Sequence, residues 1–350
     1  MTTSMYTENV TSNLSAPIAE HDFSARNYGM MLTIYVLPVI VFSGLLCNAV
    51  SCLVFTSHEL RKLSSSVYIF ALLVSDSGVL LGLLFVWLEA IGYRLNHING
   101  ICQALVFFTY VFSFLSVWYV VCVTVENYIT ICQPTQFRVM CTRKRAVTVV
   151  SAILVLSLSL YAVTAFATEV AYIEPPGIWH CSQRDELMEV LQALTYIDSV
   201  VTLLIPLLAI SGMLLPIALS ILRSTRWRKR LSSLPMLDGG KLRTVGETRK
   251  QVTRKSPRVR VAKMLLALSV SYIVMNAPSH VSRLYYLIRQ LESGNTILTY
   301  SEAFIQLSLQ YVSYLHHAIK FWIFVIISKN FSKYLRQVLS DLVHLRCLPG

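Results

Sequence analysis

Charged side chains are scarce in this chain. Asp, Glu, Lys and Arg together make up 14% of its 350 residues, whereas hydrophobic residues make up 55%. Soluble domains carry about a quarter charged residues. The low charge content therefore excludes an ordinary soluble protein and indicates a chain that is surrounded by lipid.

Signatures of catalysis and of cofactor binding are also missing. The sequence contains no nucleotide-binding glycine loop and no zinc-ligand spacing. The one candidate cluster is His316 and His317 with Asp76, but adjacent helical residues point about 100° apart, so both histidines cannot ligate one metal in a bundle. We interpret the two histidines as polar packing between helices. We therefore expect no enzyme, no cofactor and no bound metal.

Two further absences concern targeting and transport. No basic segment followed by a short apolar stretch opens the chain, so we expect no cleaved signal peptide and insertion by the first span itself. No internal repeat of the kind found in transporters is evident. A transporter is therefore a less favoured alternative, which transport of a radiolabelled solute would reveal.

Long apolar stretches are what the chain does have. A helix needs about 20 mostly apolar residues to span the hydrocarbon core of a bilayer, where it pairs its own backbone polar groups. Seven stretches qualify, at approximately 30–56, 66–91, 101–132, 145–168, 193–222, 260–288 and 298–327. The sequence thus predicts an all-α membrane protein, a seven-transmembrane helix bundle.

Basic residues are distributed unevenly between the segments that join these stretches. Of the 30 Lys and Arg residues, 24 lie in segments 57–65, 134–145, 223–263 and 328–350. Basic residues gather on the cytoplasmic side of membrane proteins, so we expect these segments inside and the N-terminus outside the plasma membrane. The net charge of +12 then reflects contact with anionic lipids and an intracellular partner, with no nucleic acid.

Three regions follow from this topology. They are a disordered extracellular tail at 1–29, the helix bundle at 30–327 with a flexible basic cytoplasmic loop at 223–259, and a short amphipathic helix with a cytoplasmic tail at 328–350. The sequons at Asn9 and Asn13 are expected to be glycosylated outside, although sequons also arise by chance in a Ser/Thr-rich tail. Cys347 is a candidate for palmitoylation.

The same topology sorts the eight cysteines. Those in predicted spans or facing the reducing cytosol are Cys47, Cys52, Cys122, Cys132, Cys141 and Cys347. Cys102 and Cys181 remain on the oxidising side, so we expect them to form a disulfide rather than to stay as free thiols. Closing this loop is worth about 4 kcal/mol in the chain-entropy model, and it would clamp the second outside loop onto the third helix.

Short motifs recur in order along the seven stretches. They are Gly44 to Asn48, Leu72 to Asp76, Cys102 at 25 positions before Asn127 in Glu126-Asn127-Tyr128, Pro206, Pro278, and Ser328 to Phe331. Each motif is weak alone, but their order and spacing resemble the rhodopsin-like (class A) G-protein-coupled receptors over residues 30–345. The resemblance implies a cell-surface receptor that signals to a heterotrimeric G protein or arrestin by helix rearrangement.

The chain departs from this family at residues that switch its members between states. Asn127 stands in place of the family's Arg, Asn276 in place of its Trp, and Lys320 to Phe324 aligns with its Asn-Pro-x-x-Tyr. The expected switch positions are Glu126, Asn127, Tyr128, Tyr272, Asn276, Pro278 and Phe324. We favour a divergent but working receptor, and a constitutive or non-signalling receptor is the alternative.

One departure concerns the polar core, for which we expect Asn48, Asp76, Ser116 and Lys320. In the family, the acid matching Asp76, the Ser matching Ser116 and the Asn of the seventh-helix motif hold Na⁺. Here that Asn is Lys320. Facing buried charges should pair, so we expect Lys320 to bind Asp76 in place of sodium; the alternative is that Lys320 snorkels to the interface.

Positions that bind ligands in the family narrow the ligand class. Amine receptors of the family bind the ligand ammonium with an Asp, and this chain has Thr109 at that position, which disfavours a monoamine ligand. Opsins bind retinal through a Lys, and this chain has Tyr314 at that position, which disfavours retinal. Acidic residues in the expected extracellular segments form a rim that favours a basic ligand; the alternative is that these carboxylates are merely solvated. The rim comprises Glu89, Glu169, Glu174, Asp185, Glu186 and Glu189. An extracellular peptide with Arg or an amidated C-terminus fits. The second inside loop, at 132–145, also resembles that of invertebrate neuropeptide receptors, including the FMRFamide type.

Asp198 is the residue expected to bind a cationic ligand group. It lies about two helical turns before Pro206. An ionisable residue at that depth is costly in lipid, so a functional role is the default interpretation, and outward snorkelling from the helix tip is the alternative. Thr109, Asp198 and Tyr314 make up the predicted ligand site.

Overall fold

The structure is a computed structural model that describes most of the chain. The described residues are 27–56, 60–173, 178–232, 257–293 and 300–346. The sequons at Asn9 and Asn13, the rim residue Glu174 and Cys347 lie outside them.

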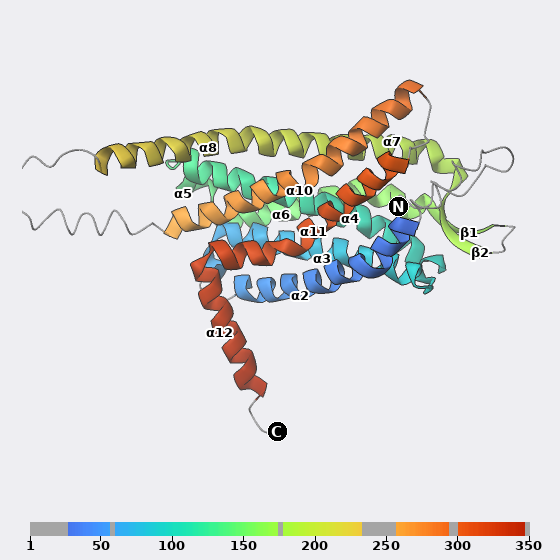
Figure 1. The fold of residues 1–350 in the computed structure, drawn as a ribbon, viewed down its shortest axis with the longest axis horizontal. Coiled ribbons are helices and arrows are strands. Elements are labelled where there is room, and N and C mark those ends of the chain that lie inside the picture. The colour runs from blue at the N-terminus through green and yellow to red at the C-terminus, as the bar shows by residue number, and fades with distance from the viewer. Residues whose placement is uncertain (1–26, 57–59, 174–177, 233–256, 294–299, 347–350) are drawn as a thin grey trace, which may run out of the picture.

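Long helices lie side by side and form the body of the molecule (Figure 1). The first helix spans Asn27–Thr56 and includes α2 at Leu37–Thr56; it is followed by α3 at Ser64–Ala90, α4 at Ile101–Cys132, α6 at Arg143–Phe166, α7 at Met188–Asp198 continued by α8 at Ile205–Ser232, α10 at Pro257–Ser293 and α11 at Tyr300–Ile327. Six of these spans are each long and apolar enough to cross a membrane, and α11 meets that test together with the helix that follows it. The expected seven-helix membrane bundle is confirmed.

The helix after the seventh span is α12, at Lys329–Arg346. It turns away by 103° from α11 and projects from the bundle (Figure 1). Phe331 anchors the bend, because its buried ring packs against those of Phe55 and Phe324.

Two boundaries differ from the predicted ones. The first helix already includes Asn27, the first residue that the structure describes, rather than starting at 30. There Tyr28 stacks on Phe304 of α11 with ring centroids 4.4 Å apart, and its hydroxyl bonds to Ser308. The expected loop 223–259 is helical at both ends, since α8 continues to Ser232 and α10 begins at Pro257. Extending a formed helix costs little, and Arg, Lys and Leu are good helix formers.

Short elements join the helices. A hairpin of β1 at Thr168–Ile173 and β2 at Ile178–Gln183 pairs antiparallel between α6 and α7, with Val170 opposite Cys181. The helix α5, at Phe137–Met140, joins α4 to α6 near the opposite end of the bundle (Figure 1).

Prolines explain two widened helical segments. A π-helical segment at Leu32–Val36 precedes Pro38, and a second at Ser199–Leu204 precedes Pro206. Proline lacks the N–H that an α-helix directs to the carbonyl four residues earlier. For Pro38 this carbonyl belongs to Ile34, and it accepts a hydrogen bond from the indole of Trp87 on α3 at 3.3 Å. The first helix is therefore tied to α3 where its own ladder is interrupted.

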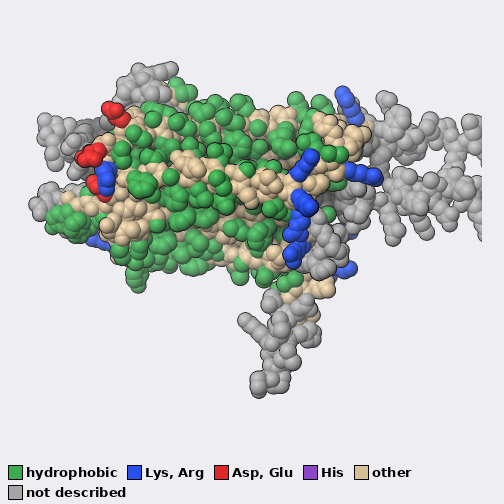
Figure 2. All heavy atoms as spheres, turned by 180° about the vertical axis from the view of Figure 1, so that it is seen from behind, with side chains coloured by type: hydrophobic (Ala, Val, Ile, Leu, Met, Phe, Trp, Pro, Cys, Tyr) green, Lys and Arg blue, Asp and Glu red, His purple; other side chains and the backbone are tan. Residues whose placement is uncertain are grey.

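The two ends of the bundle differ in charge, with a hydrophobic belt between them (Figure 2). The acidic end carries the β-hairpin and comprises Glu89, Glu169, Asp185, Glu186 and Glu189; the basic end comprises Arg61, Arg143, Lys144, Arg145, Arg223, Lys263, Lys329, Lys333 and Arg336. Exposed apolar side chains such as Phe42 and Val155 cover the belt. Such a belt is what lipid-facing helices require.

Glycines allow close helix packing near the centre. A Cβ on Gly44 would lie 2.7 Å from Leu80 and 2.9 Å from Ala318, and one on Gly78 would overlap the ring of Phe112. These contacts bring α2, α3, α4 and α11 together around the polar residues described next.

Candidate functional site

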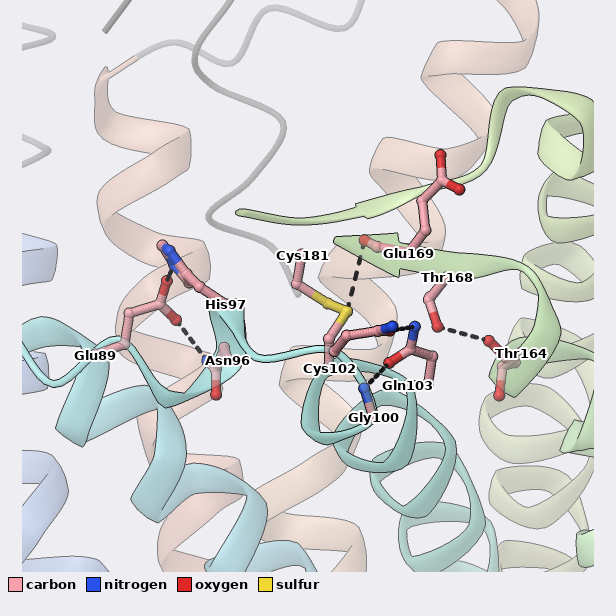
Figure 3. Close-up of a disulfide and its surroundings, with 11 residues drawn as sticks. Glu89, Asn96, His97, Gly100, Cys102, Gln103, Thr164, Thr168, Glu169 and Cys181 are labelled. Atoms are coloured by element: carbon pink, nitrogen blue, oxygen red, sulfur yellow. Dashed lines mark hydrogen bonds and ion pairs between the residues drawn. A yellow bond between two sulfur atoms is a disulfide. The ribbon is translucent and has the colours of Figure 1, made fainter. Parts of the chain in front are cut away.

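A disulfide fixes the acidic end. Cys102 at the start of α4 and Cys181 on β2 are joined, with Cα atoms 5.7 Å apart, which confirms the expected pair (Figure 3). Among the described residues, the other cysteines are free.

One free cysteine lies near the basic end, just after α5. Burial, with a smaller effect of Glu126, raises the pKa of the Cys141 thiol to about 11, so this thiol is protonated at neutral pH.

Asp198 faces the helix bundle at the end of α7. Its Oδ1 accepts a hydrogen bond from the hydroxyl of Tyr161 on α6. The Tyr161 side chain is fully buried. Tyr161 in turn stacks on Tyr110 of α4, with ring centroids 5.3 Å apart. Asp198 is thus held by aromatic residues of neighbouring helices and does not snorkel outward. Its ligand role stays a prediction.

The other two predicted ligand residues lie in different surroundings. Thr109 on α4 points toward α3, where its hydroxyl oxygen lies 3.1 Å from the position a Cβ would take on Gly82. Tyr314 on α11 packs against the α2–α3 core and edge-on to Tyr311. Both are half-buried. No contact that the structure shows between described residues joins either of them to Asp198.

Two acids of the predicted rim have partners within the chain. Glu89 accepts a hydrogen bond from Asn96 at 2.7 Å, and Glu169 pairs with Arg184 at 3.1 Å (Figure 3 shows Glu89, Asn96 and Glu169). The exposed Glu169–Arg184 ion pair is weak, so it reduces the negative potential of the acidic end without removing it.

A polar cluster lies at the centre of the bundle around Asp76 of α3. Its Oδ1 accepts hydrogen bonds from Ser116 of α4 and His317 of α11, each at 2.7 Å. Its Oδ2 lies 2.7 Å from the Nζ of Lys320, and neither side chain of this pair is exposed. Lys320 also donates to the carbonyl of His316 at 3.2 Å. The expected ion pair is present, and Lys320 does not snorkel.

The residues of this cluster do not fit a sodium ion. The Lys320 ammonium lies against Oδ2 of Asp76, and Ser116 and His317 donate to Oδ1, so both carboxylate oxygens already have partners. A second cation there would face the positive charge of Lys320 in a buried site. Asn48, predicted for the same cluster, instead donates to the carbonyl of His317 at 3.2 Å and braces α11.

The two adjacent histidines have different environments. His317 reaches Asp76, whereas His316 is 1% exposed and its ring packs edge-on to Tyr272 with centroids 5.5 Å apart. Neither ring nitrogen of His316 has a hydrogen-bond partner among the described residues. The sequence analysis placed both histidines near Asp76. Adjacent helical residues point about 100° apart, so the sequence indicates that the two side chains face different directions but not which of them contacts Asp76.

The predicted switch residues of α4 contact two different helices. Glu126 accepts a hydrogen bond from Ser64 at the start of α3. Asn127 is fully buried against α10. In the orientation that satisfies both ends of its side-chain amide, Asn127 donates to the carbonyl of Ala262 at 3.0 Å and accepts from the N–H of Leu266 at 3.2 Å. Tyr128 is half-buried beside them.

The remaining switch residues lie along α10 and α11. Asn276 accepts a hydrogen bond from Ser313 of α11 at 2.6 Å. Buried Tyr272 lies one turn closer to the basic end, and Phe324 is buried near α12. Pro278 lies inside α10 and withholds the N–H that Val274's carbonyl would accept. This arrangement makes Pro278 a point where α10 can bend.

Comparison with known proteins finds similarity to a receptor family and to a curated relative. The model of the family described as "7 transmembrane receptor (rhodopsin family)" matches residues 47–317. The chain is also similar to the Neuromedin U receptor homolog nmur-2 of Caenorhabditis elegans, with 21% identity over 337 residues that cover 88% of this chain and 79% of the relative.

Proposed function

The chain belongs to the rhodopsin family of seven-transmembrane receptors, a family of non-enzymes, and on that premise we propose that it is a plasma-membrane receptor for a neuropeptide. As a class A G-protein-coupled receptor it is a multi-pass membrane protein. In the proposed topology the acidic end faces outside and the basic end faces the cytoplasm, in agreement with the distribution of Lys and Arg. The basic end then meets a heterotrimeric G protein or arrestin.

The observation that carries the ligand proposal is the bundle-facing carboxylate of Asp198. It lies in the acidic-end half of the bundle beside Tyr161. Further carboxylates at the same end attract a cation from solution. A peptide that carries Arg matches this arrangement, because guanidinium binds carboxylate through paired hydrogen bonds. The relative that is a neuromedin U receptor homolog also favours a peptide ligand.

A neuropeptide library tests this proposal. The receptor is expressed in cells with G-protein and arrestin readouts, and we expect the active peptides to contain Arg or an amidated C-terminus. Against such a peptide, Asp198→Asn should raise the half-maximal concentration at least tenfold, whereas the exposed acid Glu189→Gln serves as the matched control and should change it less than threefold. Replacing the peptide's Arg by citrulline should add little to the Asp198→Asn loss. An unchanged response of Asp198→Asn would show that the ligand role is wrong.

A divergent receptor that signals constitutively or not at all is the alternative. Asn127 and Asn276 favour it, because both replace family switch residues and both are held by buried hydrogen bonds. In that case no peptide of the library changes either readout, while the receptor still reaches the cell surface.

We also propose that Lys320 supplies the cation of the polar core. The ammonium is covalently part of α11 and lies 2.7 Å from Oδ2 of Asp76, which supports this proposal. A fixed cation contributes a constant free energy to the resting state, so the conformational equilibrium should not respond to sodium.

A further inference from the structure

Four exposed basic side chains gather where α6 begins at the basic end. Arg143, Lys144 and Arg145 form the first turn of α6, and Arg61 lies in the short 3₁₀ helix at Leu60–Lys62 between α2 and α3. Arg143 donates a hydrogen bond to the carbonyl of Arg61, which holds the two segments together. Among the described residues, none of the four is paired with a carboxylate. We call these four residues the basic cluster.

The basic cluster is unfavourable for the fold by itself. The first turn of a helix carries a partial positive charge, so basic side chains are repelled there. The first turn of α6 holds three of them and no acidic residue. Like charges that lie close together also repel one another. A multiply charged anion from outside the chain would offset both kinds of repulsion.

An open groove continues from the basic cluster along α6. Its lining begins at Val147 and Thr148 and ends at Ser159. Residues four apart lie on one face of a helix, so Arg143 and Lys144 stand one turn before the groove on the same face. From Val147 to Ser159 the helix rises about 18 Å, close to the hydrocarbon thickness of one leaflet, about 15 Å. The cluster and the groove therefore form one amphipathic surface.

This surface faces lipid rather than another helix. Only 17% of the residues in the most apolar stretch of α6 are buried inside the structure, the smallest share among the six spans. In the groove, Val155 is 63% exposed and Leu156 is 57% exposed. The hydroxyls of Thr148 and Ser159 donate to carbonyls of their own helix, so they need no outside partner. Such a surface suits an acyl chain, and at the basic end Lys and Arg side chains border the hydrophobic belt (Figure 2).

We propose that the basic cluster and the α6 groove bind one phosphoinositide of the inner leaflet, with its headgroup on the cluster and one acyl chain in the groove. Four adjacent cations match a headgroup with several phosphate charges better than they match a singly charged phospholipid. The guanidinium groups of Arg143 and Arg145 bind phosphate oxygens through paired hydrogen bonds. The inference rests on the proposed topology, in which the basic end meets the inner leaflet, and it is independent of the peptide ligand.

Native mass spectrometry of the purified full-length receptor tests the headgroup site. Phosphatidylinositol bisphosphate is added in increasing amounts, and phosphatidylcholine serves as the reference without net charge. Lys144→Gln/Arg145→Gln keeps the contact of Arg143 and should weaken binding of phosphatidylinositol bisphosphate about thirtyfold. Arg223→Gln/Lys263→Gln is the matched control, because it removes two exposed charges from α8 and α10 at the same end. The control should change the affinity by less than about threefold.

The groove is tested by filling it without a change in charge. Ala152→Phe places a ring in the groove and should weaken binding of the long-chain lipid about threefold or more, while binding of soluble inositol trisphosphate stays unchanged. Leu208→Phe, at a 63% exposed position on α8, should leave both affinities unchanged. All of these positions are exposed, so thermal unfolding should show that every variant is folded.

Two outcomes would overturn the proposal. One is an equal affinity of Lys144→Gln/Arg145→Gln and of the control pair for phosphatidylinositol bisphosphate. The other is binding of soluble inositol trisphosphate as tight as that of the long-chain lipid, which would show that no acyl chain takes part. The lipid reaches both ends of the receptor in detergent, so the result does not depend on topology. A receptor that answers no peptide yet binds the lipid at α6 would refute the proposed ligand and leave this site intact.

Discussion

The Asp76–Lys320 pair predicts an unusual response to sodium. Both side chains are fully buried, with Nζ and Oδ2 2.7 Å apart. Asp76→Asn removes the negative charge, so the buried Lys320 ammonium keeps neutral acceptors such as the carbonyl of His316 at 3.2 Å but loses its counter-ion. Removing one member of a buried pair costs about 3 to 5 kcal/mol, because the other charge stays buried and uncompensated. We expect Asp76→Asn to lower the thermal stability and the surface expression of the receptor.

Lys320→Asn should have a different effect. Asp76 then keeps Ser116 and His317 as donors, but the volume of the ammonium becomes free beside a buried carboxylate. We expect sodium to bind there. For one site, binding stabilises the folded receptor by about 0.4 kcal/mol when the sodium concentration equals the dissociation constant, and by about 1.4 kcal/mol at ten times that concentration.

Thermal unfolding of the purified receptor in nanodiscs measures both effects. Sodium chloride is exchanged for choline chloride at constant ionic strength, so that only the small cation changes. The unaltered receptor should show no sodium dependence, and Lys320→Asn should gain stability with sodium. A Lys320→Asn/His317→Gln variant tests whether the nearby imidazole substitutes for the lost cation.

A double variant separates charge pairing from packing. In Asp76→Asn/Lys320→Met neither charge remains, so most of the stability lost in Asp76→Asn should return. The reasoning is refuted if Lys320→Asn shows no sodium effect while Asp76→Asn folds as well as the unaltered receptor. The two residues would then not act as partners.

Two other predictions follow from covalent and steric contacts. Peptide mapping by mass spectrometry without reduction should find Cys102 linked to Cys181, and Cys102→Ser should reduce surface expression because the loop loses about 4 kcal/mol of chain-entropy stabilisation; free thiols at both positions would contradict the topology. Gly78→Ala should destabilise the bundle by about 1 to 3 kcal/mol, because its Cβ would overlap the Phe112 ring. Thermal unfolding should show partial recovery in Gly78→Ala/Phe112→Leu, and a fully stable Gly78→Ala would show that α3 and α4 do not pack this closely.

Some features of the candidate site could be predicted because they depend on charge and depth alone. Asp76 and Lys320 are isolated charges in apolar stretches, and lipid penalises each so strongly that pairing is the expected outcome. The structure forms that pair. The partner of Asn127 could not be predicted in this way, because a neutral carboxamide can bond to almost any backbone group that comes within reach.

The length and hydropathy of the apolar stretches determined the seven spans, and the distribution of Lys and Arg predicted their orientation. That orientation puts Cys102 and Cys181 alone on the oxidising side of the membrane, which predicted their disulfide. These are properties of single segments in a bilayer, so they can be inferred without knowing how the helices pack. Only the tertiary structure decided that His317 rather than His316 meets Asp76, that Tyr161 holds Asp198, and that Asn127 binds the backbone of α10. Those contacts depend on the rotation and close approach of helices far apart in the sequence, which side-chain packing sets and no local pattern encodes.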